Sequence, residues 1–116
     1  MSYVSIEGKK IYYREFGKGD SIVFLNGLMM TTNSWLPFVK YFSKSYRMIL
    51  VDLLDQGRSD SYEADYTIST QADFLNAFLE KLNIKKTHLL GISYGGRVAL
   101  SYALKYEDRV RSLILA

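Results

Sequence analysis

The sequence predicts an α/β fold with a mostly parallel sheet and helices on both of its faces. Four apolar runs lack the alternation of a half-exposed sheet and are therefore typical of strands covered on both faces. These runs are Ile22–Leu25, Met48–Val51, Leu89–Ile92 and Leu113–Ala116. Segments with helical spacing separate them, and strands that alternate with helices form a parallel sheet through right-handed crossovers.

The chain begins with a predicted β-hairpin. The stretches Tyr3–Ile6 and Lys10–Glu15 are rich in β-branched and aromatic residues, and a turn with Gly8 separates them. Short strands on either side of a glycine-containing turn are the usual signature of a hairpin. The hairpin therefore precedes the parallel part of the sheet.

Three helices are predicted between the buried strands. Their ranges are Asn33–Ser43, Ser69–Leu82 and about Tyr94–Tyr106. Pro37 fits the first of them only if it lies in the first turn, because proline removes an amide donor from the helix interior. Ser69 or Thr70 is the expected N-cap of the second helix.

Length and composition restrict the class of protein. The 116 residues fit one domain, residues 1–116, and the 48% of apolar residues can form a core. The net charge of +3 comes from scattered side chains, which argues against a nucleic-acid partner. The absence of cysteine and the single histidine predict no metal site and no cofactor. Without a membrane span or signal segment, we expect a cytoplasmic protein with a small-molecule substrate.

One motif carries chemistry. Gly91-Ile92-Ser93-Tyr94-Gly95 matches G-x-S-x-G, in which a strained turn lifts a serine hydroxyl above the sheet. Gly91 and Gly95 suit the crowded positions of this turn, and the following helix directs its N-terminal amides at Ser93. A phosphate loop is disfavoured because Arg97 and Val98 replace the required Lys and Ser or Thr, and the middle glycine of a dinucleotide fingerprint is missing. A glycine-rich turn without chemistry stays open on the pentapeptide alone.

Three segments in this order resemble the α/β-hydrolase superfamily. They are Val23–Met30 followed by Trp35, Val51–Asp60, and Gly91–Arg97. The resemblance implies that Ser93 is the nucleophile and that the backbone amides of Leu28 and Tyr94 form the oxyanion hole. Asn26 stands where the family has histidine, and we expect it to hold the loop by local hydrogen bonds. Asp55 replaces a usual glycine in Asp52–Ser59, whose polar residues are expected to form turn contacts more than to line the pocket.

The sequence does not supply a base for Ser93. His88 lies five residues earlier on the same strand, roughly 16 Å away, whereas a hydrogen bond reaches about 3 Å. In the family, the acid and the histidine follow on later strands. The chain therefore resembles the N-terminal portion of such an enzyme, ending after about the sixth strand, and is expected to be inactive alone. The exposed edge Leu113–Ala116 predicts association with a second copy or with the missing C-terminal half.

The expected activity is hydrolysis of an ester, thioester or related acyl bond. Acyl transfer and cleavage of a carbon–carbon bond on the same fold are alternatives, as is a non-catalytic, self-associating interaction module. Apolar residues near the expected pocket suggest an apolar acyl group, although such residues also form ordinary cores. They are Phe24, Leu28, Met29, Met30 and Tyr94.

Overall fold

The computed structural model describes residues 2–116, which form one six-stranded sheet with the strand order β1-β2-β4-β3-β5-β6. The strands are β1 (Ser2–Ile6), β2 (Lys9–Phe16), β3 (Ser21–Leu25), β4 (Arg47–Val51), β5 (Thr87–Gly91) and β6 (Val110–Leu115). β3 pairs in parallel with β4 and β5, and β5 pairs in parallel with β6. The predicted α/β class and the four parallel strands are confirmed.

The predicted hairpin is also present. Ile6 pairs with Lys9, so the turn consists of Glu7 and Gly8 alone. Both have positive φ, 50° and 79°, as a two-residue type I′ turn requires. β2 continues into the sheet by pairing antiparallel with β4, with Tyr13 opposite Val51.

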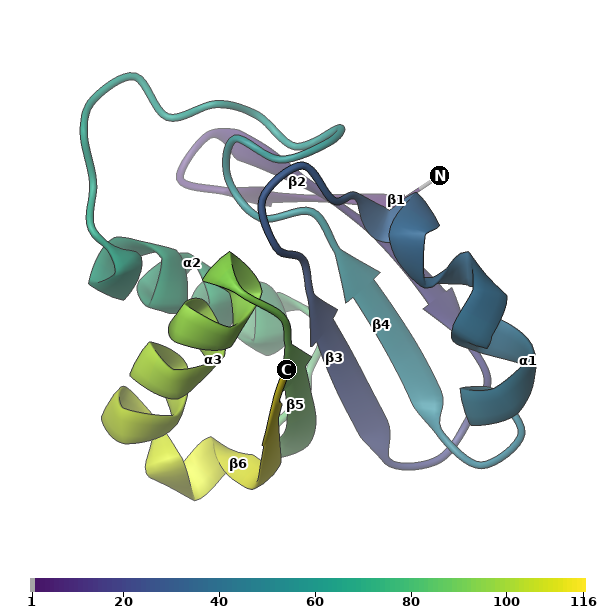
Figure 1. The fold of residues 1–116 in the computed structure, drawn as a ribbon. Helices are drawn as coiled ribbons and strands as arrows, with labels where there is room; N and C mark the ends of the chain where they lie inside the picture. The colour runs from purple at the N-terminus through teal and green to yellow at the C-terminus, as the bar shows by residue number, and fades with distance from the viewer. Residues whose placement is uncertain (1) are drawn as a thin grey trace.

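Two helical layers cover the sheet. α2 (Ile68–Lys81) and α3 (Tyr94–Lys105) lie on one face, and the 3₁₀-helix η1 (Thr32–Phe38) followed by α1 (Val39–Phe42) lies on the other (Figure 1). A short 3₁₀ turn, η2 (Glu107–Arg109), precedes β6. The larger core cluster lies under α2 and α3, where Phe78 and Tyr102 are almost fully buried. The smaller one packs Trp35 against Phe24.

The first helical segment differs from the predicted helix Asn33–Ser43. It is a 3₁₀-helix up to Phe38 and only one turn of α-helix after it, and Pro37 lies near the end of η1 instead of in a first turn. Because Pro37 has no amide hydrogen, regular α-helical bonding starts only beyond it. Thr31 caps η1, with its side chain accepting from the Asn33 amide.

The start of the second helix is also corrected. Thr67 is the N-cap of α2, in place of Ser69 or Thr70, and its hydroxyl accepts from the Thr70 amide at 3.2 Å. Thr67 has the extended backbone that an N-cap needs, with φ −100° and ψ 169°. Ile68 therefore begins the helix one residue before the predicted range.

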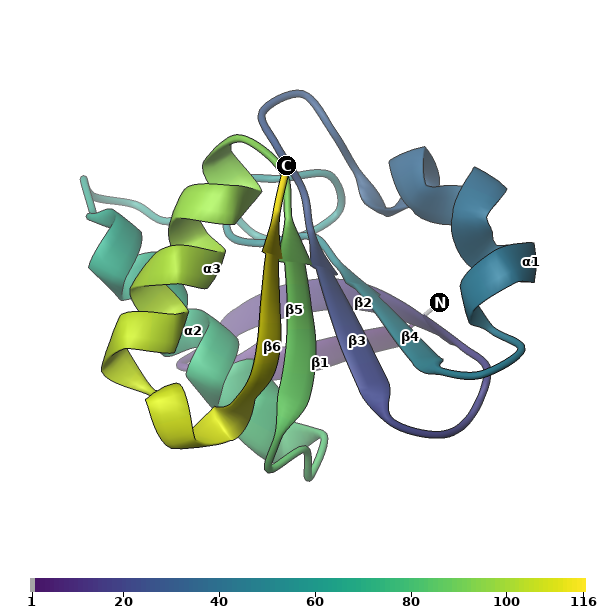
Figure 2. The same ribbon diagram turned by 60° about the horizontal axis from the view of Figure 1, so that its bottom comes forward.

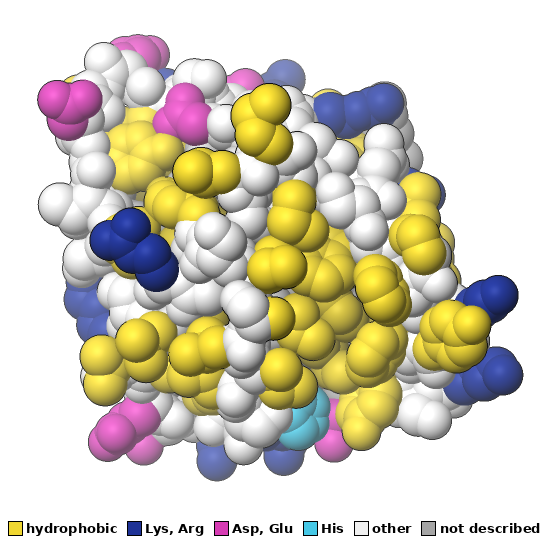
Figure 3. Space-filling view, in the orientation of Figure 1, with side chains coloured by type: hydrophobic (Ala, Val, Ile, Leu, Met, Phe, Trp, Pro, Cys, Tyr) yellow, Lys and Arg dark blue, Asp and Glu magenta, His cyan; other side chains and the backbone are white. Residues whose placement is uncertain are grey.

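β6 forms an edge of the sheet and is less buried than the other parallel strands. Every residue of β3 is buried, whereas Ile114 is 47% exposed and Leu115 is 51% exposed. On the face shown in Figure 3, hydrophobic side chains form a patch that lies between the strands β5 and β6 on one side and helix α1 on the other. Among residues 2–116, no helix is both long and apolar enough to cross a membrane.

Candidate active site

The candidate site lies at the carboxyl ends of the parallel strands. β3, β5 and β6 point toward the same edge, where the chain's C-terminus also lies (Figure 2). Ser93 is exposed at this edge between β5 and α3, with φ 53° and ψ −118°. Positive φ is strained for a residue with a side chain, and such strain concentrates at functional sites.

The turn Gly91–Gly95 around Ser93 forms an elbow between β5 and α3, and its two glycines, Gly91 and Gly95, stand where no side chain fits. A Cβ atom at Gly91 would lie 2.4 Å from the Gly95 carbonyl oxygen, and one at Gly95 would lie 2.2 Å from the Leu25 carbonyl oxygen. Both obstacles are backbone atoms, which cannot rotate away. The start of α3 therefore packs directly on the ends of β5 and β3.

The loop after β3 lies against Ser93. A Cβ atom at Gly27 would lie 3.3 Å from the Ser93 Cβ, and the Ile92 amide donates to the Leu25 carbonyl at 3.3 Å. Leu28 follows directly in this loop, and Tyr94 is the first residue of α3. In the described part of the chain, neither of these two amides donates to another protein group.

The buried side chain of Asn26 anchors the loop after β3. Its Oδ1 accepts from the Trp35 indole at 2.7 Å. Its Nδ2 lies within donor distance of the Val51 carbonyl (3.2 Å), Asp52 Oδ1 (2.9 Å) and Gln56 Oε1 (3.2 Å). The structural role predicted for Asn26 agrees with these contacts.

Asp52 organises the loop that follows β4. Its buried carboxylate accepts from the Thr32 amide at 3.0 Å and the Arg58 amide at 3.1 Å, in addition to Asn26. The Ser59 hydroxyl donates to its backbone carbonyl. Asp52 and Ser59 thus make the loop contacts expected of this segment.

A second polar network joins the same loop to the elbow. The Tyr66 hydroxyl donates to Asp55 Oδ2 at 2.5 Å, which holds the pKa of that carboxyl below its ordinary value, while burial raises the pKa of Tyr66. The buried Gln71 donates to the Leu54 carbonyl at 3.1 Å and to the Tyr94 hydroxyl at 3.2 Å. The Tyr94 side chain is therefore fixed beside Ser93.

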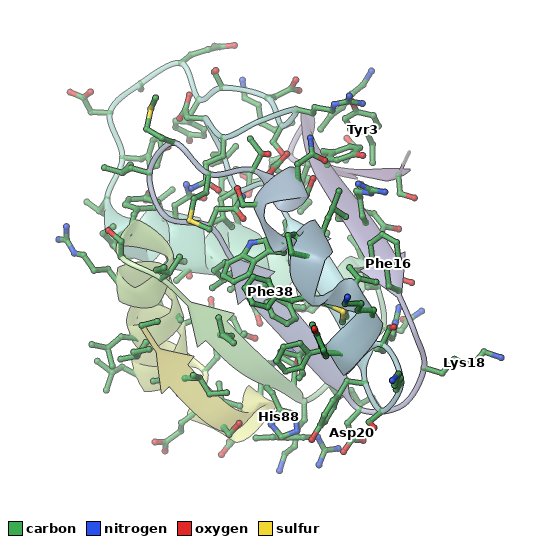
Figure 4. The ribbon with its side chains drawn as sticks, turned by 45° about the vertical axis from the view of Figure 1, so that its right-hand side comes forward. Tyr3, Phe16, Lys18, Asp20, Phe38 and His88 are labelled. Atoms are coloured by element: carbon green, nitrogen blue, oxygen red, sulfur yellow. The ribbon has the colours of Figure 1, made fainter. Side chains whose placement is uncertain are left out.

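His88 lies at the other end of β5, as predicted. Its Nδ1 is 2.6 Å from the Ser112 hydroxyl, and its ring packs edge-on against Tyr46. Figure 4 shows it toward the end of the sheet where Asp20 precedes β3. His88 is thus not brought to Ser93. Residues 2–116 also contain no cluster of three or more His, Cys, Asp or Glu side chains suited to a metal ion.

Two open hollows of the surface lie away from the serine. One of about 490 Å³ lies between β2 and η1, and a shallower one of about 540 Å³ lies near the turns before β3 and β5. Neither includes Ser93 in its lining. The loop after β3 carries two exposed apolar side chains, Leu28, which is 71% exposed, and Met29, which is fully exposed.

Several polar residues of the site were not anticipated from the sequence. Gln56, Gln71 and Tyr66 make contacts with partners 11 to 30 positions away. The only local signal is Gln71, a polar residue on the apolar stripe of its helix, where an unpaired amide would be destabilising.

A sheet of this order, with a strained serine between its fifth strand and the next helix, defines the α/β class of hydrolases. Comparison with known proteins agrees: the family model of the alpha/beta hydrolase fold matches residues 20–116. The chain belongs to the alpha/beta hydrolase family.

Three similar proteins illustrate the relationship. The alpha/beta hydrolase MGS-M2 from a Medee basin deep-sea metagenome library is 39% identical, with a TM-score of 0.95 over 98% of this chain and 43% of its own. A 2-hydroxy-6-oxononadienedioate/2-hydroxy-6-oxononatrienedioate hydrolase of Paraburkholderia phymatum is 34% identical over 91% of this chain and 39% of its own. A thermophilic esterase from Thermogutta terrifontis is 28% identical, with a TM-score of 0.92 over 99% of this chain and 45% of its own. The chain spans less than half the length of each.

Proposed function

We propose that the protein is a serine hydrolase that cleaves an ester, a thioester or a related acyl bond. The observation that carries this proposal is the backbone of Ser93, exposed and strained at φ 53° between β5 and the first turn of α3. The neighbouring glycines and the loop after β3 are consistent with it. Relatives named as hydrolases support the reaction class but leave the bond open.

In the proposed reaction, the Ser93 hydroxyl oxygen attacks the acyl carbon while its proton passes to a base. The carbonyl oxygen becomes an oxyanion, which accepts from the amides of Leu28 and Tyr94, and the positive end of the α3 dipole adds to this stabilisation. Collapse expels the alcohol or thiol, which takes the proton. Water then releases the acid from the acyl-serine and restores Ser93.

The base and the acid that orients it belong to a part of the protein outside residues 2–116 in this proposal. A serine hydroxyl requires such a base to become a strong nucleophile, and His88 bonds with Ser112 instead. We therefore expect the 116-residue chain alone to hydrolyse esters no faster than a Ser93→Ala variant of it.

Labelling with a fluorophosphonate tests the proposal. The protein at its natural length is expected to carry one phosphonyl group on Ser93, and Ser93→Ala is expected to carry none. Ser101→Ala is the matched control, because Ser101 lies on the same helix away from the elbow. Labelling that persists in Ser93→Ala would contradict the proposal.

Hydrolysis of a carbon–carbon bond is the second candidate. It is favoured by the 34% identity to the Paraburkholderia phymatum hydrolase and by a meta-cleavage product hydrolase that is 27% identical with a TM-score of 0.90. Both reactions use an acyl-enzyme or a hydrated carbonyl at the same site, so labelling does not separate them. Turnover of p-nitrophenyl esters without cleavage of a 2-hydroxy-6-oxo-dienoate would favour the ester reaction, and the reverse result the carbon–carbon reaction.

A further inference from the structure

We propose that Asn26 and Gln56 are positioning residues that clasp the loop after β3 and thereby fix the Leu28 amide beside Ser93. This inference rests on the proposed function, because it assigns these two side chains a part in the same oxyanion hole.

The loop has few contacts of its own. The side chains of Leu28 and Met29 are exposed, and Met29 adopts a positive φ of 66°. Within the part of the chain that the structure describes, two hydrogen bonds close the turn, from the Met30 amide to the Gly27 carbonyl at 3.3 Å and from the Gly27 amide to the Met30 sulfur at 3.2 Å. Such weak local bonding does not fix an amide to the accuracy that catalysis needs.

The paired contacts of Asn26 and Gln56, here called the clasp, add a constraint to the bonds that Asn26 makes with Trp35, Val51 and Asp52. Gln56 Nε2 donates to the Asn26 carbonyl at 3.3 Å, while Asn26 Nδ2 donates toward Gln56 Oε1 at 3.2 Å. The same Oε1 accepts from the Leu53 amide at 3.0 Å, which ties Gln56 to its own loop. Two amide side chains thus join the loops after β3 and β4 in both directions.

The clasp acts on the loop directly next to its contacts with the elbow. Asn26 lies between Leu25, whose carbonyl accepts from the Ile92 amide, and Gly27, where an added Cβ atom would lie 3.3 Å from the Ser93 Cβ. The loop is therefore fastened to the elbow on one side and to Gln56 on the other. Rotation of the Asn26 backbone would move the Leu28 amide, and the clasp opposes that rotation.

Gln56→Met tests this role in the protein at its natural length. Methionine has nearly the same size, and Gln56 is half-buried, so the fold is expected to persist. We expect kcat to fall about 10- to 100-fold, less than the 10²- to 10³-fold typical of a lost oxyanion donor, while KM changes less than about 3-fold. Affinity for phenylboronic acid, whose adduct with serine mimics the tetrahedral state, is expected to fall by the same factor as kcat/KM. Gln56→Glu keeps the contact to Leu53 but loses the donor, and is expected to change in the same direction.

Thr87→Val is the matched control. It removes a buried hydrogen bond of 2.8 Å between the Thr87 and Ser21 hydroxyls, which joins neighbouring strands at the opposite end of the sheet. We expect it to lower the unfolding midpoint at least as much as Gln56→Met without changing kcat. An unchanged kcat in both Gln56 variants, or an equal loss in Thr87→Val, would overturn the positioning role. If Ser93→Ala keeps the wild-type rate, the proposed function itself fails.

Discussion

Gly95→Ala adds only one methyl group but is expected to disrupt the elbow severely. The new Cβ would lie 2.2 Å from the Leu25 carbonyl oxygen and 2.6 Å from the Asn26 carbonyl oxygen. Each distance must grow to about 3.4 Å, an ordinary contact, and only a shift of α3 or of the end of β3 can provide this. Overpacking costs about 1–3 kcal/mol, and we expect a value near 3 kcal/mol because rigid backbone surrounds the site.

Two measurements on the protein at its natural length test this expectation. Urea unfolding gives the loss of stability, and the rate of fluorophosphonate labelling of Ser93 is expected to fall about 100-fold, the effect of a 1 Å misplacement. Gly96→Ala is the control at the next position, where a Cβ would lie 3.3 Å from the nearest atom. Alanine also has a higher helix propensity than glycine, so the unfolding free energy of Gly96→Ala is expected to differ from that of the wild type by less than about 1 kcal/mol. Equal stability and labelling of Gly95→Ala and Gly96→Ala would refute the reasoning.

Three further predictions concern the surroundings of the site. Thr67→Ala removes the N-cap of α2 and is expected to lower the unfolding free energy by about 1 kcal/mol in urea titrations, whereas Ser69→Ala is expected to cost less. Tyr66→Phe removes the donor that lowers the pKa of Asp55. A lowered carboxyl pKa stabilises the folded state at pH values above the ordinary 3.8, and this stabilisation is lost as the pH falls through the pKa of the folded state. We therefore expect the unfolding free energy of Tyr66→Phe to be lower than that of the wild type by less than about 1 kcal/mol at pH 7, and the difference to disappear in acid. The 116-residue chain alone is expected to sediment as an oligomer through the β6 edge, and Ile114→Lys to shift it toward the monomer; a wild-type monomer would contradict this.

Local patterns predicted the strands and α3 well because these elements are defined by their own residues. The runs at Ile22–Leu25 and Met48–Val51 lie in β3 and β4, whose strand residues are buried by helices on both sides. The run at Leu113–Ala116 has the same apolar pattern, and its exposure was expected only from the family resemblance, which places it at an edge; Ile114 and Leu115 are indeed exposed. Apolar composition alone does not carry that information.

Tertiary contacts explain most of what the sequence did not predict. The clasp joins residues 30 positions apart, and Gln71 reaches Tyr94 across 23 positions, so neither has a local pattern. At α2, Ser69 and Thr70 were equally good caps by residue type, and the backbone conformation of Thr67 decided the outcome. The strained φ of Ser93 followed from its motif because the glycines on either side specify the turn.

In the proposed reaction, Ser93 becomes covalently acylated. Rapid acid quench of the protein at its natural length with p-nitrophenyl acetate, followed by tryptic digestion and mass spectrometry, tests it directly. We expect one acetyl group on the peptide Thr87–Arg97, located at Ser93 by fragmentation and absent from Ser93→Ala. Acetylation elsewhere, or ester hydrolysis at the wild-type rate by Ser93→Ala, would contradict it.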